Sequence, residues 1–94
     1  MQIKWLTKAL QNLDEEAIYI AKENPAAAAK VVQQIMGSVA LLKDQPAMGA
    51  AGRIAGTREL VIAGTRYLVP YRVKDKQIEI LRIFHTSRKP PAQW

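Results

Sequence analysis

The chain has 94 residues, enough for one domain spanning residues 1–94, and its lack of cysteine and single histidine exclude disulfides and a thiolate or zinc site, so no metal and no cofactor are expected. The N-terminus lacks the apolar core of a signal peptide and no apolar run approaches membrane-spanning length, which predicts a cytoplasmic protein without a membrane partner. The formal net charge is +6, and residues 53–94 hold nine basic and three acidic side chains against five of each in residues 1–52, so the C-terminal half is expected either to meet a polyanionic or acidic partner or simply to maintain solubility.

The first segments predict a strand followed by a helix. Residues 2–5 alternate polar and apolar side chains, as in a short strand that joins a sheet. Residues 7–23 form the first helix, with the Thr7 hydroxyl as its N-cap. Its inward face is expected to consist of apolar residues three and four apart, namely Leu6, Leu10, Leu13, Ala17 and Ile20.

Asn24-Pro25 separates this helix from a second helix over residues 25–44. Asparagine is a good N-cap, and proline is tolerated at the first helical position because its missing N–H is not needed there. The second apolar face comprises Ala28, Val32, Ile35, Val39 and Leu42. Two helices with matching faces and a very short turn are expected to pack antiparallel.

The remainder of the chain predicts a loop, three strands and a tail. Residues 46–56 are rich in glycine and alanine without periodicity, and they lack the lysine–serine/threonine ending of a phosphate-binding loop. Residues 57–85 form an antiparallel meander of three β-branched runs, residues 57–63, 66–73 and 77–85, separated by short breaks. The segment 86–94 is a tail that Trp94 would hold down.

The faces of the three strands can be assigned from their alternation. The middle run has an apolar face, expected to lie on the helices, and a second face that shows arginines. The last run is apolar on both faces and is expected to be the most interior. Pro70 cannot donate to a central ladder, so it predicts a bulge or an outward-facing backbone at that point. The fold class is α+β, in the order β-α-α-β-β-β, with an antiparallel sheet packed on an antiparallel helical hairpin.

This arrangement resembles the RelE/ParE superfamily of bacterial type II toxins over essentially the whole chain. The most specific pieces are Gly52-Arg53, Gly56 to Leu60, Tyr71 to Val73, Ile78 to His85, and the helix turn Asn24 to Ala28, which is similar to the ParE-like branch. The resemblance implies a toxin with a role in plasmid stabilisation. It also implies a cognate antitoxin, which wraps the toxin with its C-terminal segment and contacts operator DNA on behalf of the pair.

The resemblance leaves two molecular targets open. RelE-like members are ribosome-dependent mRNA endoribonucleases, whereas ParE-like members poison DNA gyrase without known nuclease chemistry. Arginines could stabilise a pentavalent phosphate and a histidine could act as acid or base, which makes Arg53, Arg66, Arg72, Arg82 and His85 a candidate nuclease set. Leu68 and Thr86 stand where some nucleases carry arginine and tyrosine, and this favours the ParE-like branch.

The candidate site residues therefore depend on the activity. For a nuclease the catalytic candidates are His85, Arg82, Arg72 and Arg66. For target or antitoxin binding they are Arg53, Arg58, Arg66, Arg72, Arg82, Arg88 and Lys89. Arg82 could instead be a structural partner of Glu59 or Glu79, and His85 a satisfied surface histidine. A third hypothesis is a basic interaction module without toxicity.

Overall fold

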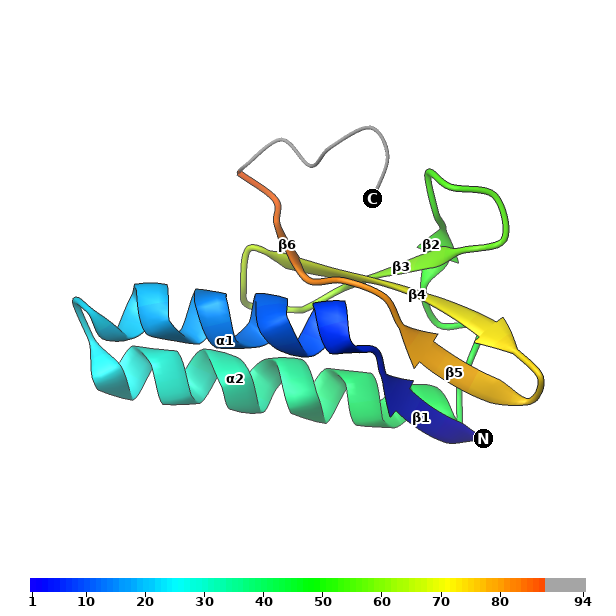
Figure 1. Ribbon diagram of the computed structural model, residues 1–94, viewed down its shortest axis with the longest axis horizontal. Helices are drawn as coiled ribbons and strands as arrows, with labels where there is room; N and C mark the ends of the chain where they lie inside the picture. Colours follow the sequence, from blue (N-terminus) through cyan, green and yellow to red (C-terminus); the bar gives the residue numbers. More distant parts are fainter. Residues whose placement is uncertain (88–94) are drawn as a thin grey trace.

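Two helices lie against one face of a sheet of six strands in the computed structural model, which describes residues 1–87 (Figure 1). In chain order the elements are β1 (Gln2–Trp5), α1 (Thr7–Ala21), α2 (Pro25–Ala40), the 3-10 turn η1 (Leu41–Lys43), β2 (Ala50–Ala51), β3 (Arg58–Val61), β4 (Tyr67–Lys74), β5 (Gln77–Ile80) and β6 (Phe84–His85). The predicted α+β class and the position of the helical hairpin are confirmed.

The sheet is mixed, not wholly antiparallel as the sequence suggested. Its order is β1-β5-β4-β3-β2, and β6 pairs with β4. The strands β2 to β6 pair antiparallel, but β1 runs parallel to β5, with Ile3 opposite Ile78. Only Leu6 separates β1 from α1, and its N–H donates to the Ile80 carbonyl at 3.1 Å. This connection fixes the direction of β1, which the sequence of the meander does not constrain.

Helix α1 faces the core with only part of the predicted set of residues. Ala9 is fully buried, Leu13 and Ile20 pack against the core, and Leu10 is 47% exposed. The inward face thus follows positions 9, 13, 16 and 20. The small side chain of Ala9 allows a close approach of the sheet. Thr7 is also not the N-cap, because Leu6 holds that position without a side-chain hydrogen bond.

Helix α2 supplies most of the helical contribution to the core. Ala28, Ile35, Val39 and Leu42 are buried as predicted, but the predicted Val32 lines the groove between the helices and Val31 packs against the core instead. The Asn24 side chain accepts the Ala27 N–H at 3.1 Å as the predicted N-cap. Residues 25–43, α2 with η1, are long and apolar enough to span a membrane by length and composition alone, which the sequence analysis did not anticipate. In this fold 22% of an 18-residue window of that segment is buried, and Ala28, Ile35, Val39 and Leu42 are the buried residues of the segment.

Strand β4, and not the last run of the chain, is the most interior strand. Tyr67, Val69 and Tyr71 face the helices and are buried, as predicted. Leu68 and Pro70 on the other face are buried as well, so that face carries an arginine only toward its end, at Arg72. The central position of β4 follows from its pairing with β3 on one side and with β5 and β6 on the other.

The predicted run 77–85 is divided by a bulge opposite Pro70. Tyr71 pairs with Ile80 and Leu68 pairs with Phe84, so three residues, 81–83, face only two on β4. The Pro70 carbonyl accepts the Leu81 N–H at 3.0 Å, which places the missing proline N–H on the same side. The bulge that Pro70 predicted is therefore present, and it lies on the partner strand.

The predicted loop 46–56 contains a short strand, β2, that pairs Ala50 with Glu59 and Ala51 with Arg58. The connection from β2 to β3 projects on the side of the sheet away from the helices (Figure 1). Alanine-rich sequence carries little strand signal, so β2 depends on hydrogen bonds to its neighbour. The expected role of Trp94 lies outside the described residues.

The bulge has an obligatory side-chain partner, and this leads to a stability prediction. The side-chain oxygen Oδ1 of Asn12 on α1 accepts the Ile83 N–H at 3.1 Å in a half-buried position. Asn12→Ala should lower the free energy of unfolding by about 1–3 kcal/mol because it leaves that N–H without an acceptor. Urea denaturation measures the effect, with exposed Gln11→Ala as the matched control; equal stability of the two variants would contradict the prediction.

Candidate functional site

The loop between η1 and β3 is fixed to the sheet by one buried hydroxyl. The Tyr71 hydroxyl donates to the Pro46 carbonyl at 2.8 Å and accepts the Gly49 N–H at 2.8 Å. A Cβ at Gly49 would lie 2.7 Å from the Tyr71 ring, so only glycine permits this approach. The loop therefore enters the sheet along a single defined path.

A second tie to the same loop comes from Arg58. Its Nη1 donates to the Gly49 carbonyl at 2.8 Å and to the Ala47 carbonyl at 3.3 Å. Arg58 lies opposite Tyr71 in the sheet register, so both side chains approach the loop from the same face. This predicted binding residue is half-buried and has a structural role.

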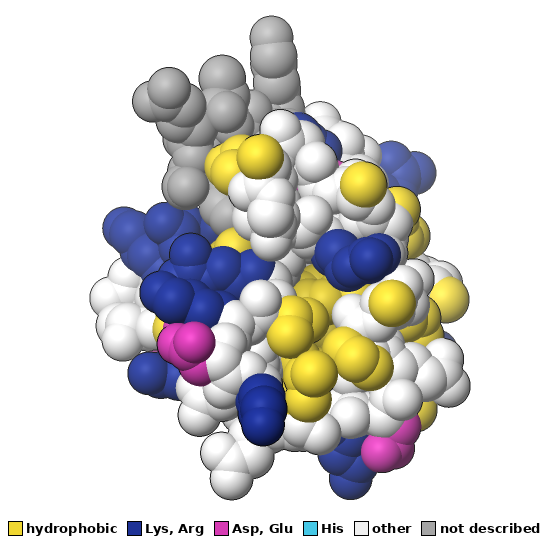
Figure 2. Space-filling view, turned by 90° about the vertical axis from the view of Figure 1, so that its right-hand side faces the viewer, with side chains coloured by type: hydrophobic (Ala, Val, Ile, Leu, Met, Phe, Trp, Pro, Cys, Tyr) yellow, Lys and Arg dark blue, Asp and Glu magenta, His cyan; other side chains and the backbone are white. Residues whose placement is uncertain are grey.

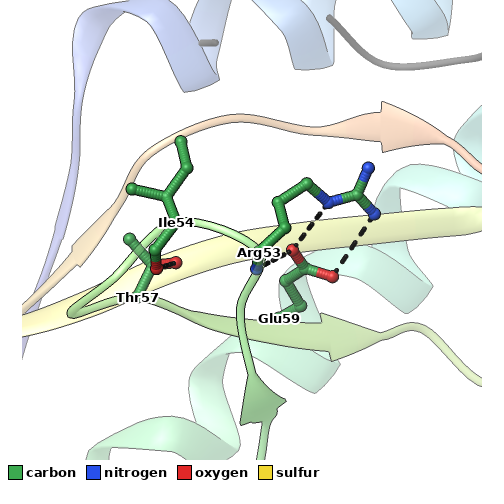
Figure 3. Close-up of polar contacts among 4 residues, drawn as sticks. All are labelled: Arg53, Ile54, Thr57 and Glu59. Carbon is green, nitrogen blue, oxygen red and sulfur yellow. Dashed lines mark hydrogen bonds and ion pairs between the residues drawn. The ribbon is translucent and has the colours of Figure 1, made fainter. Parts of the chain in front are cut away.

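Arg53 and Glu59 clamp the projecting connection between β2 and β3 (Figure 3). Glu59 Oε2 accepts from both the backbone N–H and the Nε of Arg53 at 3.0 Å. Thr57 donates its hydroxyl to the Ile54 carbonyl at 2.6 Å. Burial alone would raise the pKa of Glu59, but the hydrogen bonds and charge of Arg53 hold that pKa below its ordinary value of 4.5.

Arg72 forms the other ion pair, across the β4–β5 ladder. It lies directly opposite Glu79, and its Nε donates to Glu79 Oε1 at 2.5 Å. This hydrogen bond, and the positive charges of Arg72, Lys74 and Lys4, lower the pKa of Glu79 below 4.5. The carboxylates proposed as structural partners of Arg82 thus pair with Arg53 and Arg72 instead.

Arg66 and His85 come together at the opposite end of β4. The Arg66 Nη1 donates to the Ser87 hydroxyl at 2.9 Å, and the Ser87 N–H donates to His85 Nδ1 at 3.2 Å. The His85 ring meets the edge of the Tyr67 ring with a centroid separation of 5.2 Å. The Tyr67 hydroxyl donates to Glu16 Oε1 on α1 at 3.0 Å.

The predicted catalytic residues therefore occupy different parts of the sheet. Arg66 and Arg72 are six residues apart on one extended strand, a span of roughly 20 Å at about 3.3 Å per residue. Arg82 lies in the bulge, half-buried, and its Nη1 donates to the Leu81 carbonyl at 2.6 Å. Arg88 and Lys89 lie outside the described residues. Within residues 1–87, hydrogen bonds to Ser87 bring Arg66 and His85 together.

An apolar groove runs along the free side of β3. It encloses about 430 Å³ and is lined by residues of α2, η1, β2 and β3, including Leu41, Met48, Leu60 and Val61. Strand β2 pairs only with Arg58 and Glu59, so β3 continues past it as an edge. Val61, at 67% exposure, lies on this edge as an uncovered apolar side chain.

A second apolar groove lies between α1 and α2 near their turn. It encloses about 480 Å³, and its lining is mostly alanine with Ile18 and Val32. Ile18 and Tyr19 beside it are 62% and 65% exposed. Apolar surfaces of this kind in a folded chain indicate contact with another protein.

Sequence reasoning missed the residues that build these features. Tyr71 and Gly49 were quoted only as motif or loop residues, and their contact joins positions 22 apart in the chain. Ile18 lay off the predicted inward face of the first helix, and the sequence analysis assigned it no role. The short β2, which leaves the β3 edge open, has no sequence signal beyond the neighbouring glycines.

Comparison with known proteins places the chain among bacterial toxins. The family model described as the ParE toxin of the type II toxin–antitoxin system parDE matches residues 3–90. The Sinorhizobium fredii protein Y4kP, which is named for a toxin role, is 44% identical over 96% of this chain and 93% of its own length. Toxin RelE2 of Caulobacter vibrioides is 31% identical over 93% of this chain and 97% of its own.

Solved structures of toxin–antitoxin systems share the fold. A chain of the chromosomal ParDE system from P. aeruginosa superposes with a TM-score of 0.81 and 34% identity, covering 90% of this chain and 95% of that one. A chain of the RelBE2 complex from Mycobacterium tuberculosis gives a TM-score of 0.56 at 27% identity, covering 89% and 95%. The agreement in fold is thus closer with the ParDE chain than with the RelBE2 chain.

Removal of the Tyr71 hydroxyl should loosen the loop. Tyr71→Phe leaves the Gly49 N–H and the Pro46 carbonyl without their buried partner, so unfolding should need about 1–3 kcal/mol less free energy. Hydrogen exchange at the Gly49 amide should also accelerate. Gln11→Ala, at an exposed position, is the control and should stay within about 0.5 kcal/mol of the parent. Unchanged exchange at Gly49 would refute the assigned role.

The two ion pairs predict a dependence of stability on acid. A carboxyl whose pKa is lowered in the folded state stabilises the fold above its ordinary pKa of 4.5, and this contribution is lost as pH falls through the folded pKa. The variant with Glu59→Gln and Glu79→Gln should be less stable at neutral pH and should lose less stability below pH 4.5. Urea denaturation at a series of pH values tests this, and parallel curves for parent and variant would contradict it.

Proposed function

We propose, from the premise that the chain belongs to the ParE toxin family of type II toxin–antitoxin systems, that it arrests growth by poisoning DNA gyrase. The observation that carries the choice of target is the wide separation of its basic side chains. General acid–base catalysis on RNA requires its groups within hydrogen-bond reach of one phosphodiester. Arg66 with His85 and Arg72 with Glu79 occupy opposite ends of β4, an arrangement that favours binding over a single catalytic centre.

A cognate antitoxin is the partner that keeps the toxin inactive in this proposal. Two apolar grooves, along β3 and between the helices, offer surface that a partner chain could cover. A segment that folds on binding gains from such surface what it loses in conformational entropy. The solved relatives are described as toxin–antitoxin systems or complexes, which supports this partner. Operator DNA would be contacted through the antitoxin, and the setting would be the bacterial cytoplasm.

A second candidate is a ribosome-dependent endoribonuclease, supported by the contacts around Ser87. They place a guanidinium and an imidazole near one another at the end of β4. The Ser87 N–H donates to His85 Nδ1, so Nδ1 is an acceptor and the proton of a neutral ring would lie on Nε2. This pair would supply charge stabilisation and proton transfer in RNA cleavage.

The gyrase proposal is tested with purified components. The toxin, DNA gyrase, ATP and supercoiled plasmid should yield cleaved, linear DNA after protein denaturation, because a poison traps the cleavage intermediate. Tyr71→Phe toxin is assayed beside the parent to show whether DNA cleavage depends on the loop that the Tyr71 hydroxyl holds in place. Gyrase that supercoils normally and yields no added cleavage would remove this target.

The nuclease candidate makes a separate prediction in cells. Primer extension on induced transcripts should show cuts at codon positions, and Arg66→Ala and His85→Ala should each abolish them. Arg82→Ala, whose guanidinium lies in the bulge, tests the remaining predicted catalytic residue. Absence of cuts in the parent excludes the nuclease, and induction without growth arrest would leave only the non-toxic basic module.

A further inference from the structure

One end of the sheet presents a polar, cationic face that the apolar grooves do not include. The register places Lys4, Glu79 and Arg72 side by side across β1, β5 and β4, and Gln2, Gln77 and Lys74 in the next row. Their sequence neighbours Ile78, Ile80 and Tyr71 are buried in the core, so these rows point away from the helices. We call these six residues, with Asp75 and Lys76 of the turn that joins β4 to β5, the basic end of the sheet; it carries four positive charges (Lys4, Arg72, Lys74, Lys76) and two negative ones (Asp75, Glu79).

The charges at the basic end are only partly neutralised. Glu79 pairs with Arg72 through Nε. Among residues 1–87, Lys4, Lys74 and Lys76 form no ion pair and no side-chain hydrogen bond. Figure 2 shows Lys and Arg side chains gathered on one side of this end of the molecule, with an acidic group against them. The surface is therefore available to an anionic ligand.

The turn that carries Lys76 retains charge at a conformational cost. Asp75 and Lys76 have φ values of 52° and 61°, a left-handed geometry in which glycine is the least strained residue. Strain held at an exposed position suggests a contribution from its side chains beyond folding. Glycine at position 76 would relieve strain and remove a cation together, which makes this position useful for a test.

We propose that the basic end of the sheet binds the phosphate backbone of duplex DNA. Lysine, arginine and glutamine side chains are the usual donors to phosphate oxygens. Arg72 and Lys74 are roughly 7 Å apart along β4, and Arg72 and Lys4 roughly 10 Å apart across three strands, distances on the scale of a phosphate backbone.

Two features favour duplex DNA over other polyanions. The basic end contains no aromatic side chain on which the bases of a single strand could stack, a feature that single-strand binders use. The two apolar grooves described above are lined by none of its residues, whereas a bound protein segment normally needs an apolar centre. An acidic protein segment is therefore the weaker alternative.

The inference goes beyond the proposed target and does not require it. Duplex DNA could reach this surface as the segment held by a topoisomerase or as the operator bound by an antitoxin. Both sources present the same phosphodiester chemistry. They differ in whether the basic end matters when gyrase is present without an antitoxin.

The experiment is a fluorescence anisotropy titration of untagged full-length protein with a mixed-sequence duplex of about 30 base pairs at several salt concentrations. An untagged N-terminus is needed because the Met1 ammonium donates to the Lys43 carbonyl at 3.1 Å. With about four phosphate contacts the logarithm of the binding constant should fall with the logarithm of salt concentration at a slope near −4. Lys4→Gln with Lys74→Gln should reduce the slope by about 2 and the affinity about tenfold at low salt.

The controls separate this surface from net charge and from folding. Lys22→Gln with Lys30→Gln removes the same charge from the helices and should leave most of the affinity. Lys76→Gly should reduce the slope by about 1 while stability is kept or raised. Equal losses in the helix and sheet variants, or no duplex binding at low salt, would overturn the proposal.

Further arms identify the ligand and its source. Tighter binding of single-stranded DNA, or of a glutamate-rich peptide through the same lysines, would also overturn the assignment to duplex DNA. Given duplex binding, weaker trapping of cleaved DNA by the Lys4→Gln, Lys74→Gln variant in the gyrase assay assigns the duplex to the gyrase-bound segment, and unchanged trapping assigns it to the operator. Because the titration contains no gyrase, failure of the proposed target and failure of this inference are distinguishable.

Discussion

A proline in the central strand is the constraint on which the architecture of the sheet depends. Pro70 is fully buried in β4 and cannot donate to a neighbouring strand. The segment opposite Pro70 contains one extra residue, so β5 ends at Ile80 and pairing with β4 resumes at Phe84 in β6. The bulge in turn requires Asn12 of α1 to accept the Ile83 N–H, which couples the helical layer to the sheet by a polar contact. The same interruption places Arg82 in the bulge.

Buried polar contacts also decide which basic residues are available to a partner. Arg58 is occupied by loop carbonyls, and Arg53 by the carboxylate of Glu59. Arg53 donates to Glu59 through both Nε and Nη2, and Arg58 donates to two loop carbonyls, so both guanidiniums position the loop and contribute little charge to an approaching ligand. Arg72 differs because it engages Glu79 through Nε and leaves its terminal nitrogens toward solvent. The lysines at the sheet end, by contrast, belong to no ion pair within residues 1–87. A count of charges along the sequence therefore overstates the positive charge that Arg53 and Arg58 present to a partner. It understates the positive charge that Lys4 of β1 presents, because Lys4 belongs to the half of the chain whose charges balance.

The surface divides into regions with different chemistry. The outer side of the helical hairpin and the edge of β3 are apolar and hollowed, as protein-binding surfaces are. The end of the sheet formed by β1, β5 and β4 is polar and cationic. A toxin that is to bind its antitoxin and its target at once needs separate surfaces, and the apolar grooves and the cationic end of the sheet are formed by different residues of this fold.

The sequence by itself determined the class, the helical hairpin with its Asn24 cap, most of the inward face of α2 and an irregularity at Pro70, because these follow from local periodicity and from what proline and asparagine can do. It did not determine the parallel pairing of β1, the inward face of α1, the strand β2 or the burial of β4 on both faces. Those depend on which segments meet in space. The same limit applied to the site: Tyr71 meets Gly49, and Lys4 joins Arg72 across β5, only through contacts between residues far apart in the chain. Pairing register and close approach are tertiary properties, so only the folded structure could separate the arginines that hold the loop from the cations that remain exposed.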